Sequence, residues 1–152
     1  MLEGIILGFD FGMRRLGVAV GQTITKTATP LLILPTRDGI PNWEQLNILI
    51  DKWCPAALVV GVPINMDDSE MLITFAARKF ANRLRERYRL PVYPVDERLS
   101  SRAAHQQLER VRKPSPIYYK KIDHIAAQII LEQWLYEHTS LATLVSDSRH
   151  KK

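Results

Sequence analysis

The chain has 152 residues, 46% of them hydrophobic and 24% charged, which is ordinary for one globular domain and argues against extensive disorder. Its apolar runs are far too short to cross a bilayer, no secretory signal is visible, and the single Cys54 excludes an internal disulfide and a cysteine-based zinc site. The single cysteine makes a reducing cytoplasm the simplest compartment, and we expect no membrane association. The formal net charge of +5 favours a polyanionic partner, so we expect the protein to bind nucleic acid.

The first forty residues predict three consecutive strands that pair as an antiparallel meander. Residues 5–11 form an apolar run that ends at Gly12, and a tight turn leads to a second strand at 15–21. Residues 27–34 predict a third strand, with Pro30 as a point of interruption.

From residue 42 the pattern changes to helices that alternate with short strands. Asn42 is a candidate N-cap for the first helix, and Cys54 near its end is expected to be a small buried hydrophobe. Strands are predicted at 58–61 and 91–95, a second helix starts near Ser69, and further helices are expected at about 101–111 and 122–136. In the second helix, the apolar positions recur every four residues at Leu72, Ala76, Phe80 and Leu84.

This order of elements predicts an α/β protein with a mixed five-stranded sheet and helices on both of its faces. We assign 1–138 to a single domain. Residues 139–152 lose periodicity and end in basic residues, so a flexible basic tail is expected there.

Three carboxylates are candidates for the chemistry of this domain. Asp10 ends an apolar strand, Glu97 follows the predicted strand 91–95, and Asp123 adjoins the apolar side of the last helix. Each has a structural explanation as well: Asp10 can cap the hairpin with Arg14 or Arg15, and Arg98 or Lys120 can neutralise the other two. Taken together, three acids from separate elements form the oxygen-rich donor set that Mg²⁺ prefers.

Four motifs of the chain resemble the YqgF/RuvX family, which is described as pre-16S rRNA nucleases and as Holliday-junction-resolvase-like. The match runs from about residue 5 to 132 and rests on FDFGMRRLGVA from Phe9, VGVPINMD from Val60, DERLS from Asp96 and DHIAA from Asp123. Two positions depart from the family pattern: Asp68 stands where Gly is often found, and Ser101 where Thr is frequent.

The resemblance implies a ribonuclease H-like fold and places the family's three acidic positions on Asp10, Glu97 and Asp123. It further implies a nuclease dependent on Mg²⁺ or Mn²⁺ that acts on structured nucleic acid, with precursor 16S ribosomal RNA as the expected substrate and ribosomal precursor particles as expected partners. Basic and amide side chains near the acids are the expected substrate contacts: Arg14, Arg15, Asn65, Arg98, Arg112, Lys113, Lys120 and Lys121.

Three alternatives remain open on the sequence. A resolvase of four-way DNA would share the acids and act as a symmetric dimer, whereas an RNA-processing enzyme could be a monomer. A non-catalytic RNA-binding or transcription-associated factor would have the same fold but no nuclease activity. An actin-like ATPase shares the strand-to-glycine pattern at Asp10, but 152 residues leave no room for its two domains.

Overall fold

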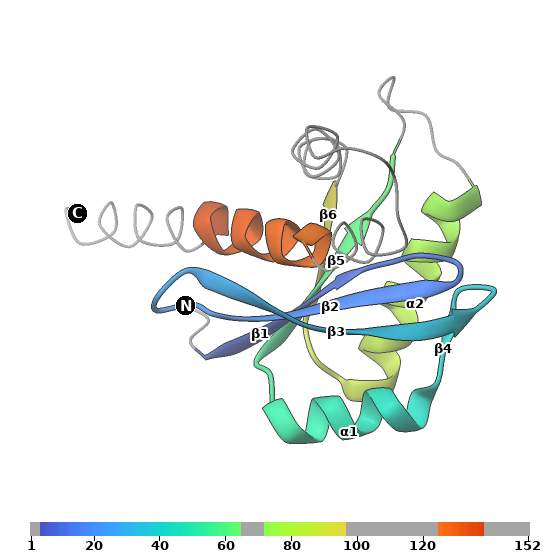
Figure 1. The fold of residues 1–152 in the computed structure, drawn as a ribbon, viewed down its shortest axis with the longest axis horizontal. Coiled ribbons are helices and arrows are strands. Elements are labelled where there is room, and N and C mark those ends of the chain that lie inside the picture. Colours follow the sequence, from blue (N-terminus) through green and yellow to red (C-terminus); the bar gives the residue numbers. More distant parts are fainter. Residues whose placement is uncertain (1–3, 65–71, 97–124, 139–152) are drawn as a thin grey trace, which may run out of the picture.

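The computed structural model describes residues 4–64, 72–96 and 125–138. In these residues one mixed sheet has the strand order β4-β3-β2-β1-β5-β6. Its first three strands are antiparallel, and β5 and β6 run parallel to β1 (Figure 1). The strands are β1 (Ile5–Asp10), β2 (Arg15–Gln22), β3 (Thr27–Arg37), β4 (Ile40–Pro41), β5 (Ala57–Val62) and β6 (Val92–Asp96). The helices are α1 (Trp43–Trp53), α2 (Leu72–Tyr88) and the helix over 125–138.

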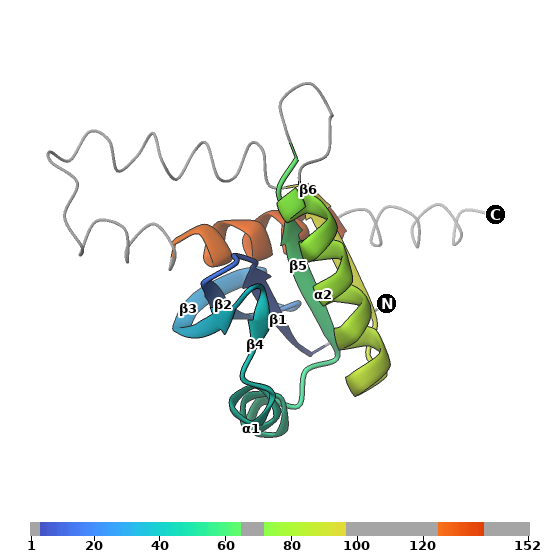
Figure 2. The same cartoon turned by 90° about the vertical axis from the view of Figure 1, so that its right-hand side faces the viewer.

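The two faces of the sheet are covered by different helices (Figure 2). Strand residues alternate between the faces. Leu7 and Phe9 belong to a core with α1 and α2, whereas Ile6 belongs to a second core with the helix over 125–138. Helices on both faces agree with the layout expected from the sequence.

The sheet has six strands where the sequence analysis expected five. The third strand continues past residue 34 to Arg37, and a two-residue turn at Asp38 and Gly39 leads into the short strand β4. Both turn residues have positive φ, 53° and 80°, as a type I′ hairpin requires. The extra strand is therefore a product of this turn.

Pro30 does not interrupt β3. Val18 of β2 pairs with Leu32, but the next residue, Ala19, pairs with Pro30, so Leu31 is an extra residue on β3. Such a bulge accommodates a proline, which cannot donate a ladder hydrogen bond. The expected break is a local irregularity within one continuous strand.

Asn42 caps α1 as predicted, because its Oδ1 accepts hydrogen bonds from the backbone amides of Glu44 and Gln45 at 3.0 and 3.3 Å. The expectation for Cys54 is wrong. This residue ends the helix in the left-handed conformation with φ of 45° and is exposed. Its backbone amide donates to the Ile50 carbonyl, and its Sγ donates to the Asp51 carbonyl at 3.2 Å at the exposed end of the helix.

In α2, Phe80 and Leu84 are buried as their spacing predicts, but Leu72 is 89% exposed because it begins the helix beyond the edge of the core. No helix in the described residues is long and apolar enough to cross a membrane. The predicted cap at Ser69, the helix expected at 101–111 and the tail at 139–152 lie outside the described residues.

Candidate active site

Asp10 is the last residue of β1, an interior strand of the sheet. It pairs with Gly17 on β2 and with Gly61 on β5. The four residues before it, 6–9, are fully buried, whereas Asp10 is half-buried. The fold thus places one carboxylate where an apolar strand reaches the edge of the sheet, and neither paired neighbour has a side chain to crowd it.

The face of the sheet to which Asp10 belongs follows from the alternation along β1. Ile6 belongs to the core with the helix over 125–138, and a Cβ on Gly8 would meet Leu131 of that helix. Asp10 is the next residue of this series, whereas Phe11 belongs to the opposite face, where its ring lies 5.4 Å from that of Phe80. Asp10 and the helix over 125–138 therefore share a face.

That helix runs against the direction of β1. Leu135 is close to Gly21, which pairs with Ile6, and Leu131, one turn earlier, reaches Gly8. Going back along the helix therefore leads toward the carboxyl end of β1, as Figure 1 also shows. Residue 125, the first described residue of this helix, and Asp10 therefore lie toward the same edge of the sheet.

Two residues of the same helix fix it to β3. Gln128 Nε2 donates to the Ala28 carbonyl at 3.1 Å, and Glu132 Oε2 accepts from the Ala28 amide at 3.4 Å. One residue of β3 is thus bonded by two side chains that are one helical turn apart. These bonds hold the helix laterally across the sheet.

The loop after Asp10 is held tightly. A Cβ on Gly12 would lie 2.6 Å from the Arg15 carbonyl oxygen, so the turn requires glycine. Thr36 of β3 fixes the loop twice: its Oγ1 donates to the Gly12 carbonyl at 3.1 Å, and its amide donates to the Arg14 carbonyl at 2.8 Å. Arg14 on this loop and Arg15 at the start of β2 are both predicted substrate contacts, and both are exposed.

Of the predicted site residues, the structure places Asp10, Arg14 and Arg15 together at one edge of the sheet. Within 4–64, 72–96 and 125–138 there is no group of three potential metal-ligating side chains. The strand β6 ends at Asp96, the residue before Glu97, and the described part of the last helix starts at residue 125, two positions after Asp123. The predicted residues outside the described ranges are Asn65, Glu97, Arg98, Arg112, Lys113, Lys120, Lys121 and Asp123.

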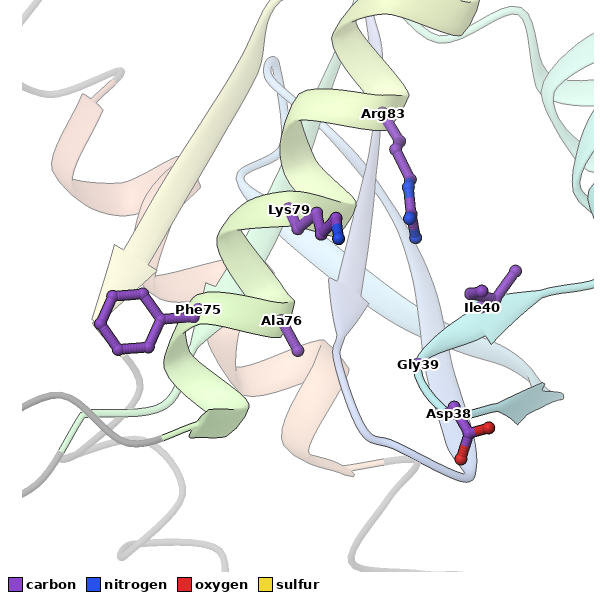
Figure 3. A pocket seen from close by; sticks show the side chains of 7 residues that line it. All are labelled: Asp38, Gly39, Ile40, Phe75, Ala76, Lys79 and Arg83. Carbon is purple, nitrogen blue, oxygen red and sulfur yellow. The ribbon is translucent and has the colours of Figure 1, made fainter.

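A pocket that the sequence analysis did not identify lies beside this edge. It has a volume of about 340 Å³ and lies between the β3–β4 turn and α2 (Figure 3). Lys79 and Arg83, one helical turn apart on α2, are the two basic residues that line it. Their spacing is readable in the sequence, but the turn that forms the opposite wall was not predicted.

The chain resembles proteins of one family along most of its length. The family model RuvX, described as Holliday junction resolvase, matches residues 4–137. A protein of Coxiella burnetii (strain Dugway 5J108-111) named "Putative pre-16S rRNA nuclease" is 52% identical over 134 residues, 88% of this chain and 93% of that protein. A protein of the same name from Hydrogenovibrio crunogenus is 48% identical over 134 residues, 88% of this chain and 95% of that protein.

Solved structures show the same fold at low sequence identity. RuvC of T. thermophilus in complex with a Holliday junction substrate has a TM-score of 0.51 at 19% identity, over 88% of this chain and 94% of that one. Fowlpox virus resolvase in complex with Holliday junction DNA has a TM-score of 0.53 at 12% identity, over 88% and 97%. These likenesses confirm the ribonuclease H-like fold class. Because the family match spans nearly the whole described fold and the relatives are about half identical, the chain belongs to the RuvX family.

Proposed function

We propose that this protein is a divalent-metal-dependent nuclease that hydrolyses phosphodiester bonds in structured nucleic acid, with the 5′ end of precursor 16S ribosomal RNA as its substrate. The observation that carries the proposal is the position of Asp10, a half-buried carboxylate at the carboxyl end of an apolar interior strand. Burying a carboxylate is costly unless a cation or hydrogen bonds compensate it. The names of the two relatives support the RNA substrate.

Asp10, Glu97 and Asp123 would hold the metal ions. Glu97 directly follows Asp96, the last residue of β6, and Val95 of that strand packs on the same side as the helix over 125–138. Asp123 stands two positions before residue 125, the first described residue of that helix, and the helix runs against the direction of β1. The donor set is entirely carboxylate, which fits Mg²⁺ or Mn²⁺.

When bound, two such ions supply Lewis-acid stabilisation of the charge that develops on the attacking and leaving oxygens of a phosphodiester. The chain's own contribution is to fix the substrate. Arg14 and Arg15 extend from a loop that Thr36 anchors, so their guanidinium groups can bind flanking phosphates without first ordering the backbone. The remaining predicted contacts, which include Lys113, Lys120 and Lys121, are basic and suit the same polyanion.

The family description favours a second candidate, the resolution of four-way DNA junctions. Chemistry at a phosphodiester does not by itself distinguish RNA from DNA. A resolvase cuts two equivalent strands and should be a symmetric dimer, whereas an enzyme that trims one RNA end has no such requirement. The oligomeric state of the active species therefore separates the two candidates.

The test is cleavage of a labelled 16S rRNA precursor and of a four-way DNA junction, side by side, with Mg²⁺ or Mn²⁺. Wild type is compared with Asp10→Asn and with Asp51→Asn, an exposed acid on α1 that loses the same charge. We expect metal-dependent cutting of the RNA by wild type and Asp51→Asn, and a loss of at least about 100-fold in Asp10→Asn. Equal cutting by Asp10→Asn, or no cutting by wild type, would refute the proposal; preference for the junction with paired nicks would select resolution.

A further inference from the structure

The pocket between α2 and the β3–β4 turn is lined on one side by cations. Lys79 and Arg83 come from successive turns of α2, and in Figure 3 both side chains extend toward the gap that separates the helix from Gly39 and Ile40. Within the described part of the chain, neither cation takes part in a hydrogen bond or an ion pair. Two positive charges that have no hydrogen bond or ion pair, in one pocket of about 340 Å³, favour the binding of an anion.

The same row of α2 extends in both directions. Arg87, one turn after Arg83, lies over the ring of Trp43 with its guanidinium carbon 4.5 Å from the ring centroid. Phe75, one turn before Lys79, is at the rim of the pocket and is 56% exposed. Residues four apart on a helix are about 6 Å apart along its axis. The row therefore presents three regularly spaced cations, Lys79, Arg83 and Arg87, and the exposed ring of Phe75 precedes them in the chain.

The pocket opens at the same edge of the sheet as Asp10. The Gly39 amide donates to the Met13 carbonyl at 2.9 Å, so the turn that forms one wall is bonded to the loop that follows Asp10. On the other wall, the buried Thr74 hydroxyl donates to the Pro63 carbonyl and ties the first turn of α2 to the end of β5. Both walls are thus anchored to the carboxyl ends of the strands.

The pocket and Asp10 nevertheless belong to opposite faces of the sheet. The pocket adjoins the face on which Phe11 contacts Phe80, whereas Asp10 shares its face with the helix over 125–138. A ligand that reaches both must pass over the edge of the sheet, where the exposed Arg14 lies. Such a ligand is a chain of phosphates rather than a single one.

We propose that Lys79 and Arg83 bind backbone phosphates of a single-stranded segment of the nucleic acid, beyond the bond that is cut, and that Phe75 stacks with a base of that segment. The inference rests on the proposed nuclease function and adds a distal subsite to it. A narrow cationic recess with an exposed ring at its rim is the arrangement that binds single strands without sequence preference. A base can stack on Phe75 only when it is unpaired, so a duplex is expected to bind more weakly than a single strand.

Asp38, on the turn across from the cations, carries the opposite charge and also lines the pocket. It repels a phosphate, so the strand is confined to the side of α2. Asp38 has φ of 53°, a conformation that asparagine tolerates as well, and Asp38→Asn therefore changes charge without changing the turn. The proposal requires this variant to bind a single strand more tightly than wild type.

The experiment measures binding of a fluorescently labelled single-stranded RNA by anisotropy, in EDTA so that no bond is cut. Wild type is compared with Lys79→Ala/Arg83→Ala and with a control, Lys26→Gly/Lys52→Ala, which removes the same two charges at the opposite edge of the sheet. Glycine suits residue 26, whose φ is 56°. Urea midpoints of all variants check that the substitutions leave the fold intact.

We expect the pocket variant to raise Kd about tenfold or more and to reduce the slope of log Kd against log salt by about 1.4, the value for two phosphate contacts to a single strand. The control is expected to change Kd less than about twofold. Phe75→Ala should raise Kd about fivefold or more and Phe75→Tyr should not, since stacking needs a ring.

Equal weakening by the pocket variant and the control would overturn the inference, as would tighter binding of a duplex than of the single strand. Because cleavage plays no part in this measurement, its outcome is independent of the proposed active site. Loss of binding in the pocket variant together with unimpaired cutting by Asp10→Asn would refute the active site and keep the subsite. Unchanged binding by the pocket variant, together with loss of cutting by Asp10→Asn, would refute the subsite alone.

Discussion

Leu131 lies directly over Gly8: a Cβ on Gly8 would approach the Cβ of Leu131 to 2.8 Å. The absent side chain lets the helix over 125–138 approach β1 closely, two residues before Asp10. The contact is with the first side-chain atom of Leu131, not with its flexible end, so neither group can turn aside. The distance between this helix and the strand that carries Asp10 is therefore set by a glycine.

Replacing Gly8 with alanine should push the helix away from the sheet. We expect a loss of about 1–3 kcal/mol in the free energy of unfolding, as for other overpacked cores, together with reduced cleavage, because residue 125 of this helix lies toward the edge that carries Asp10. Urea unfolding measures the first effect. The Leu131→Ala background should not abolish the cost, since alanine keeps the offending Cβ; full rescue would show that only the end of the leucine side chain matters.

Gly12→Ala should disturb the loop that follows Asp10. The new Cβ would lie 2.6 Å from the Arg15 carbonyl oxygen, a backbone atom that is held in the β2 strand. We expect the unfolding free energy to fall by about 1–3 kcal/mol and cleavage to fall further than stability explains. Met13→Ala, in the same loop, is the control and should change both quantities little. A Gly12→Ala protein as active as wild type would contradict the role given to this turn.

The N-cap of α1 gives a prediction that does not depend on the active site. Asn42→Ala removes the acceptor of two backbone amides and should cost about 0.5–2 kcal/mol of stability. Asn42→Asp keeps an acceptor and should stay close to wild type. Thermal or urea unfolding distinguishes the two variants, and equal losses in both would mean that Oδ1 is not the stabilising group.

Tyr88 predicts a pH dependence of stability in the alkaline range. Burial raises the pKa of its phenol above the ordinary value near 10, although Arg87 opposes the shift, and the hydroxyl donates to Asn47 Oδ1 at 2.6 Å. The folded state thus prefers the neutral phenol. The stability that Tyr88 contributes is complete below its unfolded pKa and is lost as the pH rises through the raised one.

The free energy of unfolding, measured with urea, should therefore depend on pH differently in wild type and in Tyr88→Phe. Wild type is expected to be the more stable near pH 9, and its advantage should shrink toward about pH 11 as the unfolded phenol ionises. The comparison cancels the titration of lysines, which both proteins share. A constant difference over this range would show that the phenol titrates alike in the folded and unfolded states.

Much of the fold could be predicted from local patterns. The order of strands and helices follows from hydrophobic periodicity, and Asn42 from its position before a helix. The Asp38-Gly39 pair is a common hairpin signal and could have revealed β4, but the predicted third strand ends at residue 34. Leu72 shares the spacing of Phe80 and Leu84 yet is exposed, because the spacing of apolar residues says nothing about where a helix passes the edge of the core. The expectation for Cys54 rests on residue type, which does not indicate its left-handed backbone.

The candidate site was predictable to a smaller extent. Asp10 could be identified because a carboxylate at the end of an apolar strand is costly to bury, and the family motifs assign this position to the acidic site. That Asp10 shares its face with the helix over 125–138 depends on how this helix crosses the sheet, which rests on Gly8 and Gly21. The Lys79 and Arg83 pocket depends on a turn from a distant part of the sequence, so no local pattern could have indicated it.

The bonds from Gln128 and Glu132 to Ala28 have a consequence for assembly. In the described residues, β4 covers only the Thr36–Arg37 end of β3, which leaves the first half of β3 as an open border of the sheet. An open border invites a strand from another molecule, yet both backbone groups of Ala28 are already engaged by the helix. A strand from a second copy of this protein is thus discouraged from pairing with β3 at Ala28.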